Sequence, residues 1–155
     1  MKRWLVLALC WYIQDVAQLA MTQTMLAPEI FVMSVVWYAV SDVKEAWRWQ
    51  TSALLGGLLM DFRWTGVPGL YGALFSAAVF AARWVWFQIP SANRQLFPYV
   101  AINTVMCVSL SFVRLLFWDS AVLSGRIFTI LGVQWGLSAV VLALLCVFEV
   151  FSDED

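Results

Sequence analysis

Long apolar blocks, separated by short polar or Gly/Pro-rich segments, follow one another along the whole chain. The separating segments lie near residues 42–45, 63–69, 88–95 and 119–125, and their Gly, Pro, Asp and Asn content is typical of turns. A helix needs about 20 apolar residues to cross roughly 30 Å of hydrocarbon. The pattern therefore predicts six transmembrane helices. They cover residues 4–25, 28–41, 46–62, 70–87, 96–118 and 127–151.

The second and third blocks are shorter than a full crossing. They must use flanking residues such as Arg48, whose long side chain can reach the interface, or thin the bilayer locally. In a five-helix alternative the third block is re-entrant. Lys2 and Arg3 precede the first block, as in a signal peptide. However, residues 18–20 place Gln where a cleavage site needs a small residue, so we expect a retained first helix.

The amino-acid composition also predicts a membrane protein. The chain is 63% hydrophobic and 12% charged, against about 45–50% and about 25% in soluble domains. We therefore expect an all-α polytopic membrane protein, with residues 1–155 forming one membrane domain. A net charge of −1 and the absence of histidine argue against nucleic-acid binding and remove the usual general base. Cys10, Cys107 and Cys146 match no metal spacing, and we expect no cofactor.

Basic residues predict the orientation in the membrane. With the N-terminus inside, Lys2, Arg3, Lys44, Arg48 and Arg94 fall on the inner side, and only Arg63 and Arg126 fall outside. The positive-inside rule then places both termini in the cytoplasm. Tryptophans near the expected helix ends agree with these boundaries, since indoles prefer the interface.

Polar residues at membrane depth are the first functional candidates. Asp15 lies near the middle of the first block, and Gln14, Gln18 and Thr22 follow the same helical spacing. This stripe either bonds to neighbouring helices or forms a relay or ligand site. Arg83 lies about one turn from the inner end of its helix, where we expect its guanidinium to reach the interface.

A second group of charged residues maps to the outer helix ends, where it either lines an outward-facing pocket or forms ion pairs. Its members are Glu29, Asp61, Arg63, Arg114, Asp119 and Arg126. No nucleophile with a neighbouring base and no set of metal ligands is present among them. The sequence therefore does not predict an enzyme.

Small residues recur at a spacing that favours close helix contacts. Gly132 and Gly136 form such a row, which Ala139 and Ala143 continue. A second row contains Gly69, Ala73 and Ala77, beside Gly72 and Ser76, and Gly56 and Gly57 lie in the third block. We expect these rows to pack inside the chain, with docking of a partner helix as the alternative.

The stretch from Gly56 to Asp61, followed by Gly66, Pro68 and residues 69–72 (Gly-Leu-Tyr-Gly), resembles the central signature of MreD, the bacterial rod shape-determining membrane protein family. That signature is a glycine, two leucines or similar residues, an aspartate, a Gly/Pro turn and a Gly-Leu that opens the next helix. Ala27-Pro28-Glu29 also resembles the family's start of the second helix.

The resemblance implies a six-helix fold similar to the substrate-binding subunits of energy-coupling-factor transporters. It also implies a non-catalytic scaffold of the cell-elongation machinery in the inner membrane. Such a protein binds the single-pass protein MreC, and through it RodA with its transpeptidase partner and MreB filaments, and so supports side-wall peptidoglycan synthesis. In this interpretation Asp61 accepts backbone N–H bonds and fixes the following turn. The alternative is the substrate-capturing membrane subunit of a vitamin-type transporter.

Overall fold

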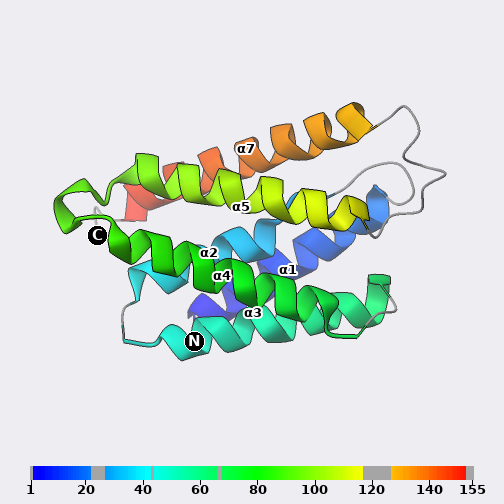
Figure 1. Ribbon diagram of the computed structural model, residues 1–155, viewed down its shortest axis with the longest axis horizontal. Helices are drawn as coiled ribbons and strands as arrows, with labels where there is room; N and C mark the ends of the chain where they lie inside the picture. Colours follow the sequence, from blue (N-terminus) through cyan, green and yellow to red (C-terminus); the bar gives the residue numbers. More distant parts are fainter. Residues whose placement is uncertain (1, 22–26, 43, 66–67, 117–126, 153–155) are drawn as a thin grey trace.

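The computed structural model describes residues 2–21, 27–42, 44–65, 68–116 and 127–152. Within these ranges the chain forms six α-helices and no strand (Figure 1). The helices are α1 (Lys2–Ala20), α2 (Ile30–Ser41), α3 (Ala46–Met60), α4 (Leu70–Gln88), α5 (Leu96–Leu116) and α7 (Ile127–Ser152). A π-helical turn, Asp61–Thr65, follows α3, and a 3₁₀ turn, Ser91–Asn93, lies between α4 and α5. The described part of the chain is thus all-helical.

Consecutive helices run in opposite directions, so their ends gather at two poles of the molecule (Figure 1). At one pole α1 and α3 end and α2, α4 and α7 begin. We call it the Asp61 end, and it lies on the right in Figure 1. The opposite pole, the Asp42 end, holds the start of α1 and the end of α7. Residues far apart in the sequence are therefore brought together at each pole.

The helix boundaries near the expected turns at Pro28 and Asp61 differ from the sequence-based expectation, and α1 ends at Ala20, before the expected residue 25. Helix α2 begins at Ile30 rather than Pro28, because the Pro28 carbonyl accepts the Ile30 N–H (3.0 Å) in a turn before the helix. Helix α3 ends at Met60, so Asp61 and Phe62 belong to the π turn. The expected helical residues 22–25 and 117–118 lie outside the described residues.

The core surrounds α2, which packs against α1, α3, α4 and α7. Along α2 the buried side chains leave no polar face: residues 31–36 and 39–40 are all buried. Helices α3 and α4 form the most extensive helix pair. The shortest helix is thus the most enclosed one, which removes its backbone from contact with the surroundings of the molecule.

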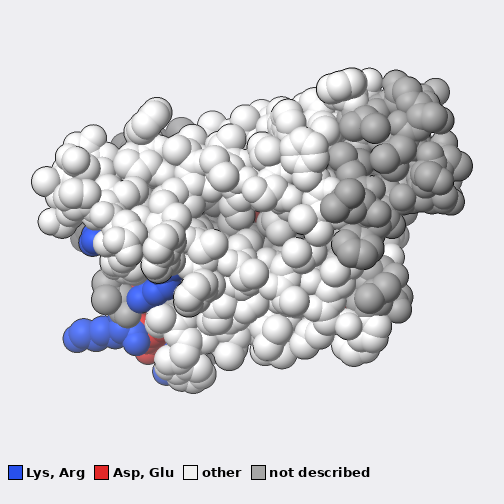
Figure 2. Space-filling view, in the orientation of Figure 1, with Lys and Arg blue, Asp and Glu red and all other residues white. Residues whose placement is uncertain are grey.

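Charged side chains are few on the face of the described chain that Figure 2 shows, and many large hydrophobic side chains of this chain are exposed. Residues Leu70–Gln88 and Leu96–Val113 are long and apolar enough to cross a membrane, with mean hydropathies of 1.4 and 1.8. Only 22% and 33% of these two stretches are buried, whereas the core helix of a soluble protein is mostly buried. Two candidate membrane-spanning helices are therefore present, and Ile30–Ser41 and Phe128–Leu144 are shorter apolar helices.

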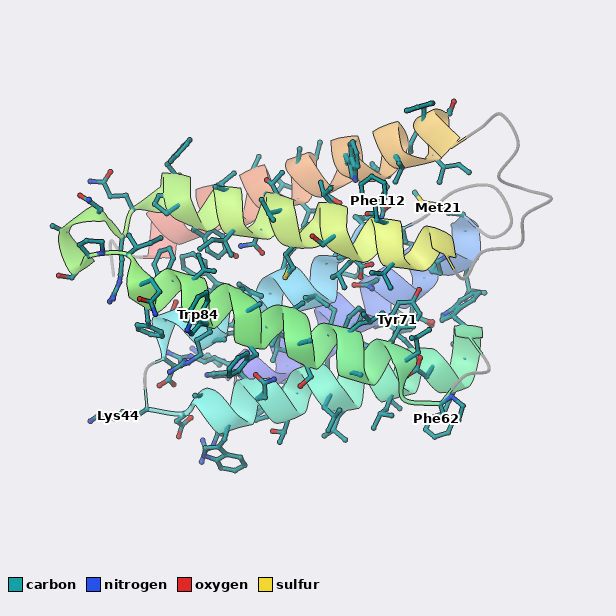
Figure 3. All side chains as sticks on the ribbon, viewed as in Figure 1. Met21, Lys44, Phe62, Tyr71, Trp84 and Phe112 are labelled. Carbon is teal, nitrogen blue, oxygen red and sulfur yellow. The ribbon has the colours of Figure 1, made fainter. Side chains whose placement is uncertain are left out.

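Charged and aromatic side chains gather at the Asp42 end. Figure 2 shows Lys and Arg on this face only near that pole, and Figure 3 places Lys44 there, opposite Met21 and Phe62. Ring contacts join four helices at this pole: Trp4 stacks on Trp49 (5.8 Å between centroids), and Trp37 meets Tyr99 edge-on (4.6 Å). The Asp42 end therefore has the composition of a membrane–water interface.

Candidate functional site

The Asp61 carboxylate caps the N-terminus of α4. Its Oδ2 accepts the N–H groups of Gly69 (3.0 Å) and Gly72 (3.2 Å), and its Oδ1 accepts that of Tyr71 (2.8 Å). The first N–H groups of a helix have no intrahelical partner, and Gly69, the N-cap residue, has no side chain to supply one. The Asp61 side chain therefore replaces an ordinary cap from the preceding turn, and its charge favours the helix N-terminus.

The turn that follows Asp61 depends on a backbone conformation that favours glycine. Gly69 has φ +93°, in the left-handed region that residues with a Cβ rarely adopt. This conformation directs the start of α4 back along α3. Gly66, the other glycine expected in this turn, lies outside the described residues. Gly69 is therefore needed for its backbone angle and not for close helix contact, because a Cβ there would meet no atom within 4 Å.

Glycine also brings the backbones of α3 and α4 into contact beside Asp61. A Cβ on Gly57 would lie 2.4 Å from the Tyr71 carbonyl oxygen and 2.6 Å from the Gly72 Cα. Gly72 in turn faces the Leu58 side chain and the Leu54 carbonyl. This close approach is what allows the buried Asp61 carboxylate to reach three N–H groups of α4. Gly57, Asp61 and Gly72 thus form one structural unit.

Asp15 of α1 binds the π turn. Its Oδ1 accepts the indole N–H of Trp64 (3.0 Å) and forms an ion pair with Arg63 Nε (3.0 Å). The Asp15 side chain is 4% exposed, while that of Arg63 is 48% exposed. One oxygen of Asp15 therefore already holds two donors from the π turn. This arrangement matches the structural interpretation of the polar stripe better than a relay or ligand site.

Two glutamines of the same stripe hold the start of α2. Gln14 Oε1 accepts the Phe31 N–H (2.8 Å), and its Nε2 donates to Glu29 Oε2 (3.1 Å). Gln18 Oε1 accepts the Ala27 N–H (3.2 Å). Since the Glu29 side chain makes no cap of its own, Gln14 supplies the cap of α2 from α1. Thr22, the last member of the stripe, lies outside the described residues.

Helix α7 joins this cluster through Gln134, which the sequence-based search for site residues did not select. Gln134 Nε2 donates to the Ala27 carbonyl (3.3 Å), and its Oε1 is buried without a hydrogen-bond partner among the described residues. The available signal was a single amide within a long apolar block. Together, Asp15, Gln14, Gln18, Asp61 and Gln134 form a polar cluster that connects α1, α2, α4 and α7 at the Asp61 end.

Two small-residue rows do not pack inside the chain, and that expectation is wrong for them. A Cβ on Gly132 or Gly136 would meet no atom within 4 Å, because Gln134 and Ser138 face the bundle instead. On α4, Gly72 faces α3, so Ala73, on a different side of the helix, is exposed and Ala77 with it. Within the described chain, close packing occurs instead at Gly56 and Gly57 of α3 and at Gly72 of α4.

At the opposite pole Arg83 caps the other end of α2. Its Nη1 donates to the carbonyls of Ala39 and Asp42 (3.1 Å for the latter), and its guanidinium lies 4.8 Å from the centre of the Phe87 ring. The last carbonyls of a helix have no intrahelical partner, and a cation there also complements the helix dipole. Arg83 therefore caps α2 at the Asp42 end of the molecule.

The structure describes the side chains of only some of the charged candidate residues. Asp15, Asp61 and Arg63 have the partners given above. The side chains of Arg114, Asp119 and Arg126 lie outside the described residues. No group of three Cys, Asp or Glu side chains that is suited to a metal ion occurs among the described residues. In the described part, the outer charged residues thus form internal bonds and caps.

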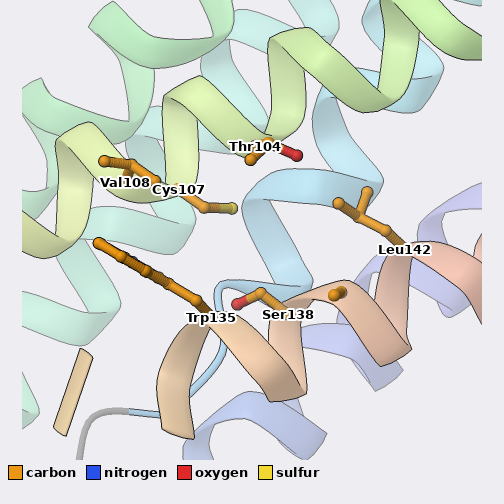
Figure 4. A pocket seen from close by; sticks show the side chains of 7 residues that line it. Thr104, Cys107, Val108, Trp135, Ser138 and Leu142 are labelled. Atoms are coloured by element: carbon orange, nitrogen blue, oxygen red, sulfur yellow. The ribbon is translucent and has the colours of Figure 1, made fainter. Parts of the chain in front are cut away.

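A small cavity lies between α5 and α7 (Figure 4). Its volume is about 50 Å³, and Cys107 of α5 and Trp135 of α7 form two of its walls. Ligand pockets for small organic molecules are typically about 300–1,000 Å³. The cavity therefore admits only a few non-hydrogen atoms, and a vitamin-sized molecule does not fit it.

No protein-family model matches this chain, and neither a curated protein nor a solved structure shows significant similarity to it.

Proposed function

We propose that this chain is a MreD-like, non-catalytic membrane scaffold. In this proposal six helices cross the inner membrane, and the protein binds a single-pass MreC-type partner. Through it, the chain takes part in a complex with RodA, its transpeptidase partner and MreB filaments that builds side-wall peptidoglycan. The biochemical activity is binding, and the polar cluster at the Asp61 end keeps the bundle in the shape that binds.

The observation that carries the proposal is the contact between the end of α3 and the start of α4, made by Asp61 and Gly57. The residues that resemble the MreD signature are separated by a turn, yet the Asp61 carboxylate bonds to Gly69, Tyr71 and Gly72. Gly57 of the same signature touches the backbone at Tyr71 and Gly72. The glycine, the aspartate and the Gly-Leu that opens the next helix are therefore needed together for one contact between α3 and α4. This contact explains physically why these residues occur together in the motif.

The distribution of charge supports a multi-pass orientation. Lys2, Arg3, Lys44, Arg48 and Arg94 lie at the Asp42 end, and Arg63 lies at the Asp61 end. By the positive-inside rule this distribution supports a cytoplasmic Asp42 end. With six crossings, the antiparallel order of the helices is consistent with both termini inside. The short helix α2 is enclosed by other helices, which offsets its length.

The rival function, a subunit that captures a vitamin-sized molecule, gains no specific support. Its expected site was the outer charged group. In the described part of that group, Asp61 accepts backbone N–H groups, Glu29 accepts the Gln14 amide, and Arg63 pairs with Asp15. These internal bonds use polar atoms that a ligand at this site would need.

The experiment that tests the proposal is purification of the tagged protein from its native membrane in a mild detergent. Mass spectrometry then identifies the retained proteins and small molecules. We expect a MreC-type single-pass protein with peptidoglycan-synthesis proteins, and no stoichiometric small ligand. Recovery of a vitamin-sized ligand, or of an ATPase-coupled membrane protein, would instead establish the transporter function.

A further inference from the structure

The cavity between α5 and α7 contains a buried hydroxyl that lacks a partner. Ser138 is 4% exposed, and its Oγ has no hydrogen bond among the described residues. Figure 4 shows the Ser138 side chain among the residues that line the cavity, on the side of α7 that faces α5. A buried hydroxyl without a hydrogen bond costs about 1–3 kcal/mol. An occupant that supplies a donor or an acceptor at this point would therefore be stabilised.

The cavity opens toward the outside of the molecule. Trp135, Thr104 and Ala139 line it, and all three are exposed. Ala139 also belongs to the row that Gly132 and Gly136 begin, where an added Cβ would meet nothing within 4 Å. The mouth of the cavity thus continues onto a smooth face of small residues. Such a face permits another helix backbone to approach closely.

The position of Ser138 along α7 restricts what can occupy the cavity. It follows Ile127 by eleven residues, which corresponds to about 17 Å at a rise of about 1.5 Å per residue. In a helix that crosses roughly 30 Å of hydrocarbon, the hydroxyl then lies near the middle of the bilayer. Lipid headgroups do not reach this depth, water is scarce there, and acyl chains form no hydrogen bonds.

Volume restricts the occupant further. A cavity of about 150 Å³ holds benzene, so the volume of about 50 Å³ found here suits a short side chain. Serine or threonine has this size and also provides the missing hydrogen bond. On these grounds we infer that the α5–α7 cavity, with the adjoining Gly132–Gly136–Ala139 face, seats a transmembrane helix of a single-pass partner, which inserts a Ser or Thr side chain toward Ser138. This inference rests on the proposed function, in which the partner is single-pass.

Photo-crosslinking in native membranes locates the partner. A benzophenone amino acid replaces Trp135, a large exposed side chain at the rim of the cavity, and in a matched control it replaces Phe80, an exposed aromatic residue of α4. We expect crosslinks from position 135 into the transmembrane helix of the MreC-type protein, close to a Ser or Thr, and none from position 80. Crosslinks from position 135 only to lipid, or only to a second copy of this chain, would contradict the docking site.

Substitutions test the same face in solution. Ala139→Leu fills the cavity mouth and should reduce the co-purified partner at least tenfold, while Ala81→Leu, at an exposed position of α4, leaves it unchanged. Ser138→Ala removes an unpaired hydroxyl, so the thermal stability of the isolated protein should not fall. Its affinity for the partner should nevertheless fall about three- to tenfold, the effect of one interhelical hydrogen bond. Ser138→Ala keeps the test valid if Ala139→Leu does not fold.

The outcomes separate this inference from the proposed function. If wild-type protein recovers the MreC-type partner and both Ala139→Leu and Ser138→Ala retain it fully, the docking site is wrong and the proposed function stands. If wild-type protein recovers no such partner, the proposed function fails. Crosslinks from position 135 into the transmembrane helix of a different, identified single-pass protein, lost when Ala139→Leu is added, would then still support the docking site.

Discussion

Gly57 of α3 lies against Gly72 of α4 so closely that a Cβ on Gly57 would be 2.6 Å from the Gly72 Cα and nitrogen. Both neighbouring atoms belong to the backbone, so no rotamer change can relieve the overlap. The two helices meet where the Asp61 carboxylate bonds to the start of α4. Close packing and capping at this position therefore depend on each other.

Replacing Gly57 by alanine should destabilise the protein. The added methyl must push α4 away from α3, and overpacking of this kind costs about 1–3 kcal/mol. Thermal unfolding in detergent should show a lower midpoint, by about 2–4 °C for each kcal/mol. Gly132→Ala is the matched control, because a Cβ there meets no atom within 4 Å. An unchanged midpoint for Gly57→Ala would mean that the two helices are further apart than described here.

Asp61→Ala should have a larger effect than loss of a single ordinary cap. Three N–H groups, those of Gly69, Tyr71 and Gly72, lose their acceptor, and the expected cost is about 2–4 kcal/mol. Asp61→Asn keeps one side-chain oxygen and should be intermediate. Amide hydrogen exchange at Tyr71 and Gly72 checks the cause directly, since both amides should exchange faster in Asp61→Ala. Unchanged protection at these amides would contradict the cap.

The Asp15–Arg63 pair should be asymmetric. The Arg63 side chain is 48% exposed, so Arg63→Gln should cost less than about 1 kcal/mol. Asp15→Asn should cost more, because the carboxylate is buried and also accepts the Trp64 indole N–H. Thermal unfolding of both single variants and of the double variant measures the coupling. Equal effects of the two single variants would show that the Trp64 bond adds nothing.

Cysteine labelling checks the orientation in the membrane. After the three native cysteines are replaced by alanine, Lys44→Cys and Phe62→Cys place one thiol at each pole, where Figure 3 shows both side chains directed outward. A membrane-impermeant maleimide should label position 62 from outside intact cells. It should label position 44 only after the membrane is opened. Labelling of both positions from the same side would contradict the six-crossing arrangement.

Particular elements show what could be read from sequence. Apolar blocks bounded by Gly, Pro and charged residues indicated the helices, since block length and turn residues act locally. The turn after Asp61 is likewise local: the carboxylate and the N–H groups that it accepts lie within eleven residues. Asp15, Gln14 and Gln18 stood out because polar residues in an apolar helix need partners. Their spacing showed that they share a face, without indicating which helix they meet.

Tertiary structure alone decided those partners. Gln14 caps α2 and Asp15 binds Arg63 and Trp64, pairings that depend on how α1 crosses the bundle. The same holds for the glycines. Gly57 and Gly132 have similar apolar neighbours in sequence, but one touches a backbone and the other faces outward. Small residues at a regular spacing show that they share one face of a helix. Whether that face lies inside or outside the bundle depends on the rotation of the helix about its axis, which results from all its contacts together.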